Sequence, residues 1–278
     1  MVVVPENVID RYDRFSLYNS PYPAHGAGCA IDLYPGTDAA HSPVSGVVRS
    51  TQAVRCPPKP YATAEDYLIL VDCGDHVARI LHVDPEVEAG DDVAVGDRLG
   101  TLIRSGFFGR WVDNHIHLGF RRPGANLRRA SGSLPIEVDV PVTGLGWDGA
   151  GGVVEAGPTH VLLDSPIAEG DPGFTALADD DGVPLDGGLV HYSGGGTLSP
   201  AEGERSLLGT TVGTATGRNL TWADVAIEAN GRRATGLSLF ASQVPFGTKV
   251  VFHTGHGFDV GDRIDVTVEP TAEPTRLG

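Results

Sequence analysis

Short apolar runs separated by turn residues constrain the fold of this chain more than any other feature of its sequence. The runs are rich in valine, isoleucine and leucine, and 38 glycines and 20 prolines break them at nearly regular intervals. No long stretch keeps the 3.6-residue apolar period of an amphipathic helix, whereas short bounded runs are typical of strands. The pattern predicts an all-β protein.

The length of 278 residues is sufficient for two ordinary domains, each with its own core. A glycine-dense piece, "GLGWDGAGGVVEAG", interrupts the strand pattern from residue 144. We therefore expect a first domain over residues 1–144, a folded β-sandwich of the barrel-sandwich kind. A second β-sandwich domain, of unknown role, is expected over residues 145–278.

Two local signals predict turns. Asn230-Gly231 stands between two alternating runs, and this dipeptide tolerates the positive φ angles of a tight hairpin. The stretches "AGDDVAVGDRLGTL" (89–102) and "GHGFDVGDRIDVTV" (255–268) echo each other. Because the echo is short, we interpret it as a shared turn followed by a strand and not as a domain duplication.

The charge balance excludes some partners. Acidic residues number 36 and basic residues 20, a net charge of −16, and Lys59 and Lys249 are the only lysines. This composition indicates adaptation to high salt, and it provides no basic surface for nucleic acid or an anionic membrane. No apolar run approaches the roughly 18–20 residues that span a bilayer. Since the N-terminus also lacks the pattern of a secretory signal, a cytoplasmic protein is expected.

The stretch "NHIHLGF" (114–120) predicts a strand with two histidines on one face. Successive side chains of a strand point to opposite faces, so His115 and His117 share a face while Ile116 and Leu118 take the other. Two neighbouring imidazoles suit a metal ion, because neutral imidazole nitrogen is a common ligand.

Two earlier stretches supply further ligand types. "PAHGAGCAIDLYPG" (23–36) contains His25 and Asp32, and "ARILHVDP" (78–85) contains His82. A catalytic zinc takes three nitrogen or carboxylate ligands and keeps its fourth position for water, whose pKa it lowers from about 15.7 toward roughly 7. Neighbouring histidines that do not bind the metal can hold the water or stabilise an oxyanion.

The order of these pieces resembles the lysostaphin-type zinc metallopeptidases, a family known for cutting glycine-containing cross-links of bacterial cell walls. The resemblance covers residues 20–123 and includes the stretches "GTDAAHSPVSGVV", "VEAGDDVAVGDRLG" and "HIHLGF". It implies that a zinc ion is bound by His25, Asp32 and His117. It also implies that His82 and His115 are the catalytic pair of a metalloendopeptidase, which would hydrolyse glycine-rich or cell-wall peptides by zinc-activated water.

The chain departs from the family pattern near the site. Leu118 and Gly119 stand where the family has an aromatic residue and a glutamate, so a carboxylate that would orient the site is expected to be missing. Phe107, Phe108 and Trp111 are expected to place apolar surface beside the cleft, which favours a different substrate.

Of two functions other than that of an enzyme, the sequence leaves one open. The alternative to an enzyme is a non-catalytic zinc-binding or peptide-binding module that retains the peptidase fold. A biotinyl or lipoyl carrier domain would need a lysine at its hairpin tip, and neither lysine of this chain is near the corresponding segments.

Overall fold

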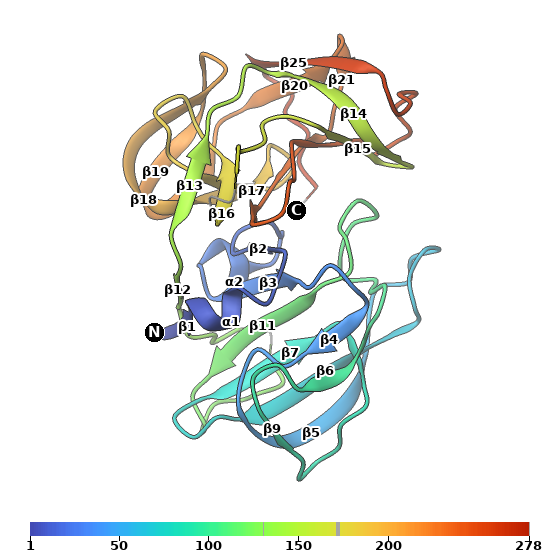
Figure 1. Ribbon diagram of the computed structural model, residues 1–278, viewed down its shortest axis with the longest axis vertical. Coiled ribbons are helices and arrows are strands. Elements are labelled where there is room, and N and C mark those ends of the chain that lie inside the picture. Colours follow the sequence, from blue (N-terminus) through green and yellow to red (C-terminus); the bar gives the residue numbers. More distant parts are fainter. Residues whose placement is uncertain (130, 171–172, 278) are drawn as a thin grey trace. The chain divides into compact units, whose positions relative to one another are not determined.

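Strands form nearly all the regular structure of the protein (Figure 1). The computed structural model describes residues 1–129, 131–170 and 173–277. This confirms the all-β prediction. The contacts divide the chain into two compact units, Met1–Phe15 with Ala27–Val140, and Ser16–Gly26 with Pro141–Gly278.

The division differs in detail from the expected one near residue 145. It falls between Val140 and Pro141, and the segment Ser16–Gly26, expected within the first domain, is grouped with the second unit. The buried Asp186 explains this grouping, because its carboxylate accepts hydrogen bonds from the Ser16 hydroxyl (2.5 Å) and from the Leu17 and Tyr18 amides (2.6 and 3.1 Å).

The first unit is built from short strands and one helical turn. Its helix is α1 (Glu6–Ile9), and its strands are β1 (Val2–Pro5), β2 (Arg14–Ser16, whose last residue belongs to the second unit), β3 (Ala30–Tyr34), β4 (Ala39–His41), β5 (Gly46–Arg55), β6 (Glu65–Asp72), β7 (Val77–Leu81), β8 (Val83–Pro85), β9 (Asp92–Val93), β10 (Arg98–Leu102), β11 (Ile116–Arg121) and β12 (Ile136–Asp139).

The main sheet of the first unit positions the candidate site. Its strand order is β2-β3-β11-β7-β6-β5-β9, and β11 runs antiparallel to both neighbours. Ile116, Leu118 and Phe120 of β11 are buried in the core. His117, between them, projects from the opposite face, as a period of two requires. A smaller sheet has the order β4-β10-β8, and β1 pairs in parallel with β12.

The second unit contains the remaining elements. These are α2 (Pro23–Gly26), β13 (Val142–Leu145), β14 (Ala150–Gly157), β15 (His160–Leu163), β16 (Phe174–Leu177), β17 (Leu185–Leu189), β18 (Gly194–Leu207), β19 (Thr210–Trp222), β20 (Val225–Ala229), β21 (Arg232–Arg233), β22 (Gly236–Leu239), β23 (Ala241–Ser242), β24 (Lys249–Val251) and β25 (Arg263–Pro270).

A large sheet organises the second unit. Its strand order is β19-β18-β17-β22-β24-β15-β14-β25-β20-β21, with the long hairpin of β18 and β19 at one end. Alternate residues of these strands, including Leu163, Leu189, Leu237 and Ile264, pack into one buried apolar cluster. The burial of this surface is the main stabilising contribution to the unit.

The two turn predictions are confirmed. Asn230 and Gly231 have φ angles of 51° and 74° and connect β20 to β21, with Ala229 paired to Arg232. In the echoing stretches, the Asp97 carboxylate accepts the Ala94 amide (2.8 Å) and the Asp262 carboxylate accepts the Asp259 amide (2.9 Å). Both units therefore use the same aspartate-closed turn before a strand.

No helix among the described residues is both long enough and apolar enough to cross a membrane.

Candidate metal centre

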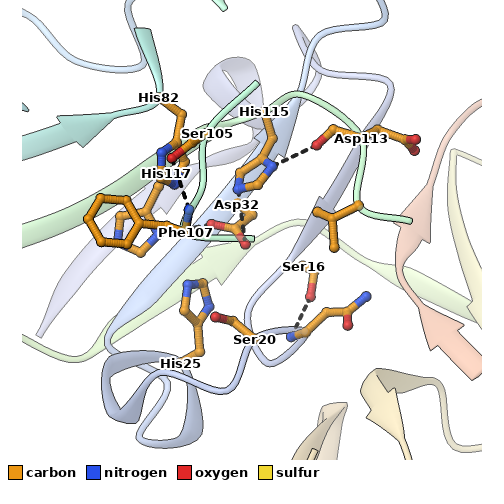
Figure 2. Close-up of polar contacts among 12 residues, drawn as sticks. Ser16, Ser20, His25, Asp32, His82, Ser105, Phe107, Asp113, His115 and His117 are labelled. Atoms are coloured by element: carbon orange, nitrogen blue, oxygen red, sulfur yellow. Dashed lines mark hydrogen bonds and ion pairs between the residues drawn. The ribbon is translucent and has the colours of Figure 1, made fainter. Parts of the chain in front are cut away.

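Asp32 and His117 are brought together by strand register. In the antiparallel pair of β3 and β11 they lie directly opposite each other. Residues opposite each other project from the same face of a sheet with their Cβ atoms about 5 Å apart. His117 Nδ1 lies 3.0 Å from Asp32 Oδ1 (Figure 2). The pairing of two strands thus aligns an imidazole and a carboxylate that are 85 positions apart.

His25 lies in the helical turn α2 and is 1% exposed. Its Nδ1 is 2.8 Å from the Leu17 carbonyl oxygen, and the Leu17 amide in turn is held by Asp186. Since a carbonyl only accepts hydrogen bonds, Nδ1 carries the proton and Nε2 is the unprotonated nitrogen of the neutral ring. That nitrogen is suited to metal binding.

One ligand atom from each of His25, Asp32 and His117 lies within 4.8 Å of the other two. Two imidazoles and one carboxylate are donors that suit a divalent transition metal, and three protein ligands leave a position for water. The donor set therefore fits a divalent metal ion. It comprises the same three residues that the sequence resemblance implies as ligands.

His115 lies beside this group on the same face. Its Nδ1 is 2.8 Å from the Asp113 carbonyl oxygen, which fixes the proton on Nδ1 in the neutral ring. Its Nε2 lies 3.5 Å from Asp32 Oδ2. The ring packs 5.1 Å from that of Tyr34, the last residue of β3. His115 thus presents a nitrogen next to the candidate ligands without being one of the clustered set.

His82 approaches from the connection between β7 and β8. Its φ angle of 69° is in the left-handed region, which a non-glycine residue seldom occupies. This backbone turn lets Asp66 accept both the His82 amide (2.9 Å) and the His82 Nδ1–H (2.5 Å). The His82 ring centroid lies 5.0 Å from that of His115 and 5.8 Å from that of His117.

Asp66, at the start of β6, is a residue that the sequence analysis missed. Burial alone would raise the pKa of its carboxyl, but the hydrogen bond and charge of His82, with hydrogen bonds from Ser105 and the Tyr67 amide, hold that pKa below its ordinary value. Asp66 therefore stays ionised beside His82. It provides an orienting carboxylate from another strand, although Leu118 and Gly119 offer none.

Ser105 was missed as well. Its hydroxyl accepts the Phe107 amide (3.2 Å), as Figure 2 shows. The same hydroxyl donates to Asp66 Oδ2 (2.5 Å), so it links Asp66 to the loop before β11. The only sequence signal for Asp66 was an aspartate at the head of the apolar run "DYLILV", and Ser105 had none.

The expected aromatic surface is present in part. The Phe108 ring lies 5.1 Å from His82 and 4.7 Å from His115, and the Phe107 ring lies 6.3 Å from His82. Trp111 is different, because it is only 8% exposed. The prediction for Trp111 was wrong: its indole is packed within the loop and offers no open surface.

Comparisons with known proteins assign the chain to a family. The solution structure of lysostaphin is similar over 89% of this chain and 96% of that chain, at 12% identity, and its TM-score of 0.28 is too low to establish a shared fold. No curated protein sequence matches the chain. The N-terminal domain of DUF8155, described as a domain of unknown function, matches residues 3–138, and the C-terminal domain of DUF8155 matches residues 143–269. The chain therefore belongs to the DUF8155 family and carries both of its domains.

Proposed function

We propose that this chain is a zinc-dependent endopeptidase that hydrolyses peptide bonds in glycine-rich or cell-wall peptides. The observation that carries the proposal is the group of His25, Asp32 and His117, whose ligand atoms lie within 4.8 Å of one another. The two further histidines beside it, each with its Nδ1 held by an oxygen, give additional support. Histidines whose protonated nitrogen is fixed in this way suit general acid–base catalysis and the stabilisation of an oxyanion.

The proposal gives each residue of the site a role. His25, Asp32 and His117 would hold the zinc ion. When bound, zinc polarises the carbonyl under attack and lowers the pKa of a water molecule to about 7. His115, with its proton fixed on Nδ1, would use Nε2 to accept a proton during attack and return it to the leaving amine.

His82 would act on the carbonyl oxygen of the substrate. Asp66 holds its Nδ1–H and balances the charge of the imidazolium form. The Nε2–H of that form can then donate to the oxygen on which negative charge develops, a contribution that strengthens in the transition state. The Phe107 and Phe108 rings pack beside the His82 ring.

The test combines metal analysis with hydrolysis of a fluorogenic glycine-rich peptide at high salt. We expect about one zinc ion per purified chain. Asp32→Ala should lose both zinc and activity. His115→Ala should keep zinc and lower kcat by at least about 100-fold, the usual contribution of general acid–base catalysis. His253→Ala, a change at an exposed histidine of the second unit, should retain both.

The outcomes separate the enzyme from its alternative. Stoichiometric zinc without turnover of any peptide would contradict the peptidase and support a non-catalytic zinc-binding or peptide-binding module. Failure of the wild-type chain to retain zinc, with Asp32→Ala unchanged in metal content, would contradict the metal centre itself.

A further inference from the structure

A cavity of about 460 Å³ opens in the first unit between the end of β3 and the segment that precedes β11. Three arginines contribute to its wall, together with Tyr34, Asp113 and Asn114; they are Arg14, Arg104 and Arg110. The chain as a whole has 20 basic residues against 36 acidic ones. Three guanidinium groups around one cavity therefore form a local exception to the negative charge of the protein.

Two of these arginines, Arg104 and Arg110, form no direct ion pair with a carboxylate of the described residues. Arg104 donates to the carbonyl oxygens of Gly109 (2.7 Å), Arg110 (2.9 Å) and Val112, and its guanidinium lies 4.7 Å from the centre of the Phe108 ring. These contacts fix its position, and the Asp113 carboxylate attracts its charge without forming a direct ion pair with it. The exposed Arg110 guanidinium forms no hydrogen bond or ion pair with any described side chain or carbonyl, and Arg104 is close enough to repel it.

Arg14 and the acidic residues of the wall complete the charge balance. Arg14 is paired with Asp113 at 2.9 Å and lies 4.8 Å from the centre of the Tyr34 ring. Asp38 accepts a hydrogen bond from Asn114 (3.3 Å). Three guanidinium groups thus face two carboxylates, so the wall keeps a net positive charge, which is at the arginines outside the Arg14–Asp113 pair, Arg104 and Arg110. An anionic group is the ligand that this side of the cavity would bind.

The cavity borders the candidate centre directly. Tyr34 lines the cavity, and its ring lies 5.1 Å from His115, while Asp32 precedes it by two residues on the same face of β3. Asp113 contributes to the wall, and its backbone carbonyl holds His115 Nδ1. An extended peptide advances about 3.3 Å per residue. A peptide at His115 would therefore place a neighbouring residue in the cavity.

We infer that this cavity binds a carboxylate of the peptide substrate, through Arg104 and Arg110, next to the bond that is cleaved. The inference rests on the proposed peptidase function and adds a specificity to it. Arginine suits this role because its planar fork donates two parallel hydrogen bonds to a carboxylate. The carboxylate could belong to an acidic side chain or to the free C-terminus of a peptide.

The experiment measures binding separately from cleavage. Six-residue glycine peptides with blocked ends carry Glu, or Gln as the neutral match, at each position in turn, and one all-glycine peptide keeps a free C-terminal carboxylate. Titration calorimetry on the full-length His115→Ala chain avoids turnover. At one of the positions, we expect the peptide with Glu to bind about tenfold more tightly than the peptide with Gln. A difference of this size is typical of hydrogen bonds to a charged group.

Arg110→Gln should remove most of this preference. Because Arg110 is exposed, the variant should unfold at the same temperature as its parent. Arg55→Gln, an identical change at an exposed position of β5, is the control and should keep the preference. If only the peptide with a free C-terminus bound more tightly than its blocked counterparts, the terminal carboxylate would be identified as the ligand.

Equal affinity for all charged and neutral peptides would overturn the inference, as would a preference unchanged by Arg110→Gln. If the wild-type chain cleaved neutral peptides and showed no preference for a carboxylate, the inference would be refuted. The proposed peptidase function would then still be supported. Carboxylate-dependent binding without cleavage of any peptide by the wild-type chain would refute the peptidase and retain the cavity as an anion-binding site.

Discussion

At the scale of the residue, the orientation of His82 depends on Asp66. The carboxylate of Asp66 receives the ring nitrogen and the backbone amide of His82 and the hydroxyl of Ser105. A buried carboxylate with these donors is ionised and fixed, and it determines which nitrogen of the imidazole carries the proton. Asp66 is therefore a positioning residue that acts through His82.

Replacement of Asp66 by Asn tests this role. The amide keeps the shape of the side chain but removes its charge and can offer His82 a donor in place of an acceptor. We expect kcat to fall about 10–100-fold, the range for groups that orient site residues, with little change in KM or zinc content. Steady-state kinetics and metal analysis on the same preparation check this.

Asp72→Asn provides the matched control at the other end of β6, where the Asp72 carboxylate is 3.7 Å from Arg49 and partly exposed. It should leave kcat unchanged. A loss of zinc in Asp66→Asn, or equal kcat in the two variants, would show that Asp66 does not act by orienting His82.

At the scale of the element, turns are specified by a few local residues. Asn230-Gly231 forms the tight hairpin that its sequence predicts, and the aspartates at positions 97 and 262 close two equivalent turns. Such turns depend on contacts within about four residues, so the sequence determines them locally. They fix where a strand begins and which face its first side chain takes.

Substitution of Gly231 by Ala measures the contribution of the hairpin. The φ angle of Gly231 is 74°, and a Cβ added there would meet no atom within 4 Å, so the cost is one of backbone conformation alone. We expect a loss of about 1 kcal/mol in the free energy of unfolding, measured from urea denaturation. Gly255→Ala, with open space and no positive φ, should show no such loss. Similar urea midpoints for the two variants would contradict the conclusion that the positive φ angle at position 231 requires glycine.

At the scale of the whole molecule, local patterns predicted the fold class but not every contact of the site. The His-x-His strand and the positions of His25, Asp32 and His82 along the chain were visible because each lies in a short motif. The role of Asp66 could not be predicted from the sequence, because its contact with His82 depends on the backbone geometry at the end of β7. The grouping of Ser16–Gly26 with the second unit was also hidden, because Asp186 lies 170 positions from Ser16.

A buried histidine should make the stability of the second unit depend on pH. Burial lowers the pKa of His191 to about 3 from 6.5, opposed in part by a hydrogen bond with the Leu189 backbone. The unfolded chain therefore binds a proton more readily than the folded one below pH 6.5. Stability is fully present above that pH and falls as the pH drops from 6.5 toward 3.

Thermal unfolding between pH 7 and pH 5 measures this effect before most carboxylates titrate. We expect the wild-type midpoint to fall steadily over this window, and His191→Gln, which does not titrate, to show a much flatter profile. His253→Ala is the control at an exposed histidine and should keep the wild-type slope. Parallel profiles for wild type and His191→Gln would contradict the prediction.

The left-handed backbone at His82 sets an evolutionary constraint on this position. Glycine would occupy a φ angle of 69° without the cost of about 1 kcal/mol that a side chain with a Cβ bears. Glycine would, however, leave the buried Asp66 carboxylate without the imidazole that donates to it. A lineage of this chain that abandoned its chemistry should therefore reach glycine at position 82 only together with a neutral residue at position 66, so the two positions should change as a pair.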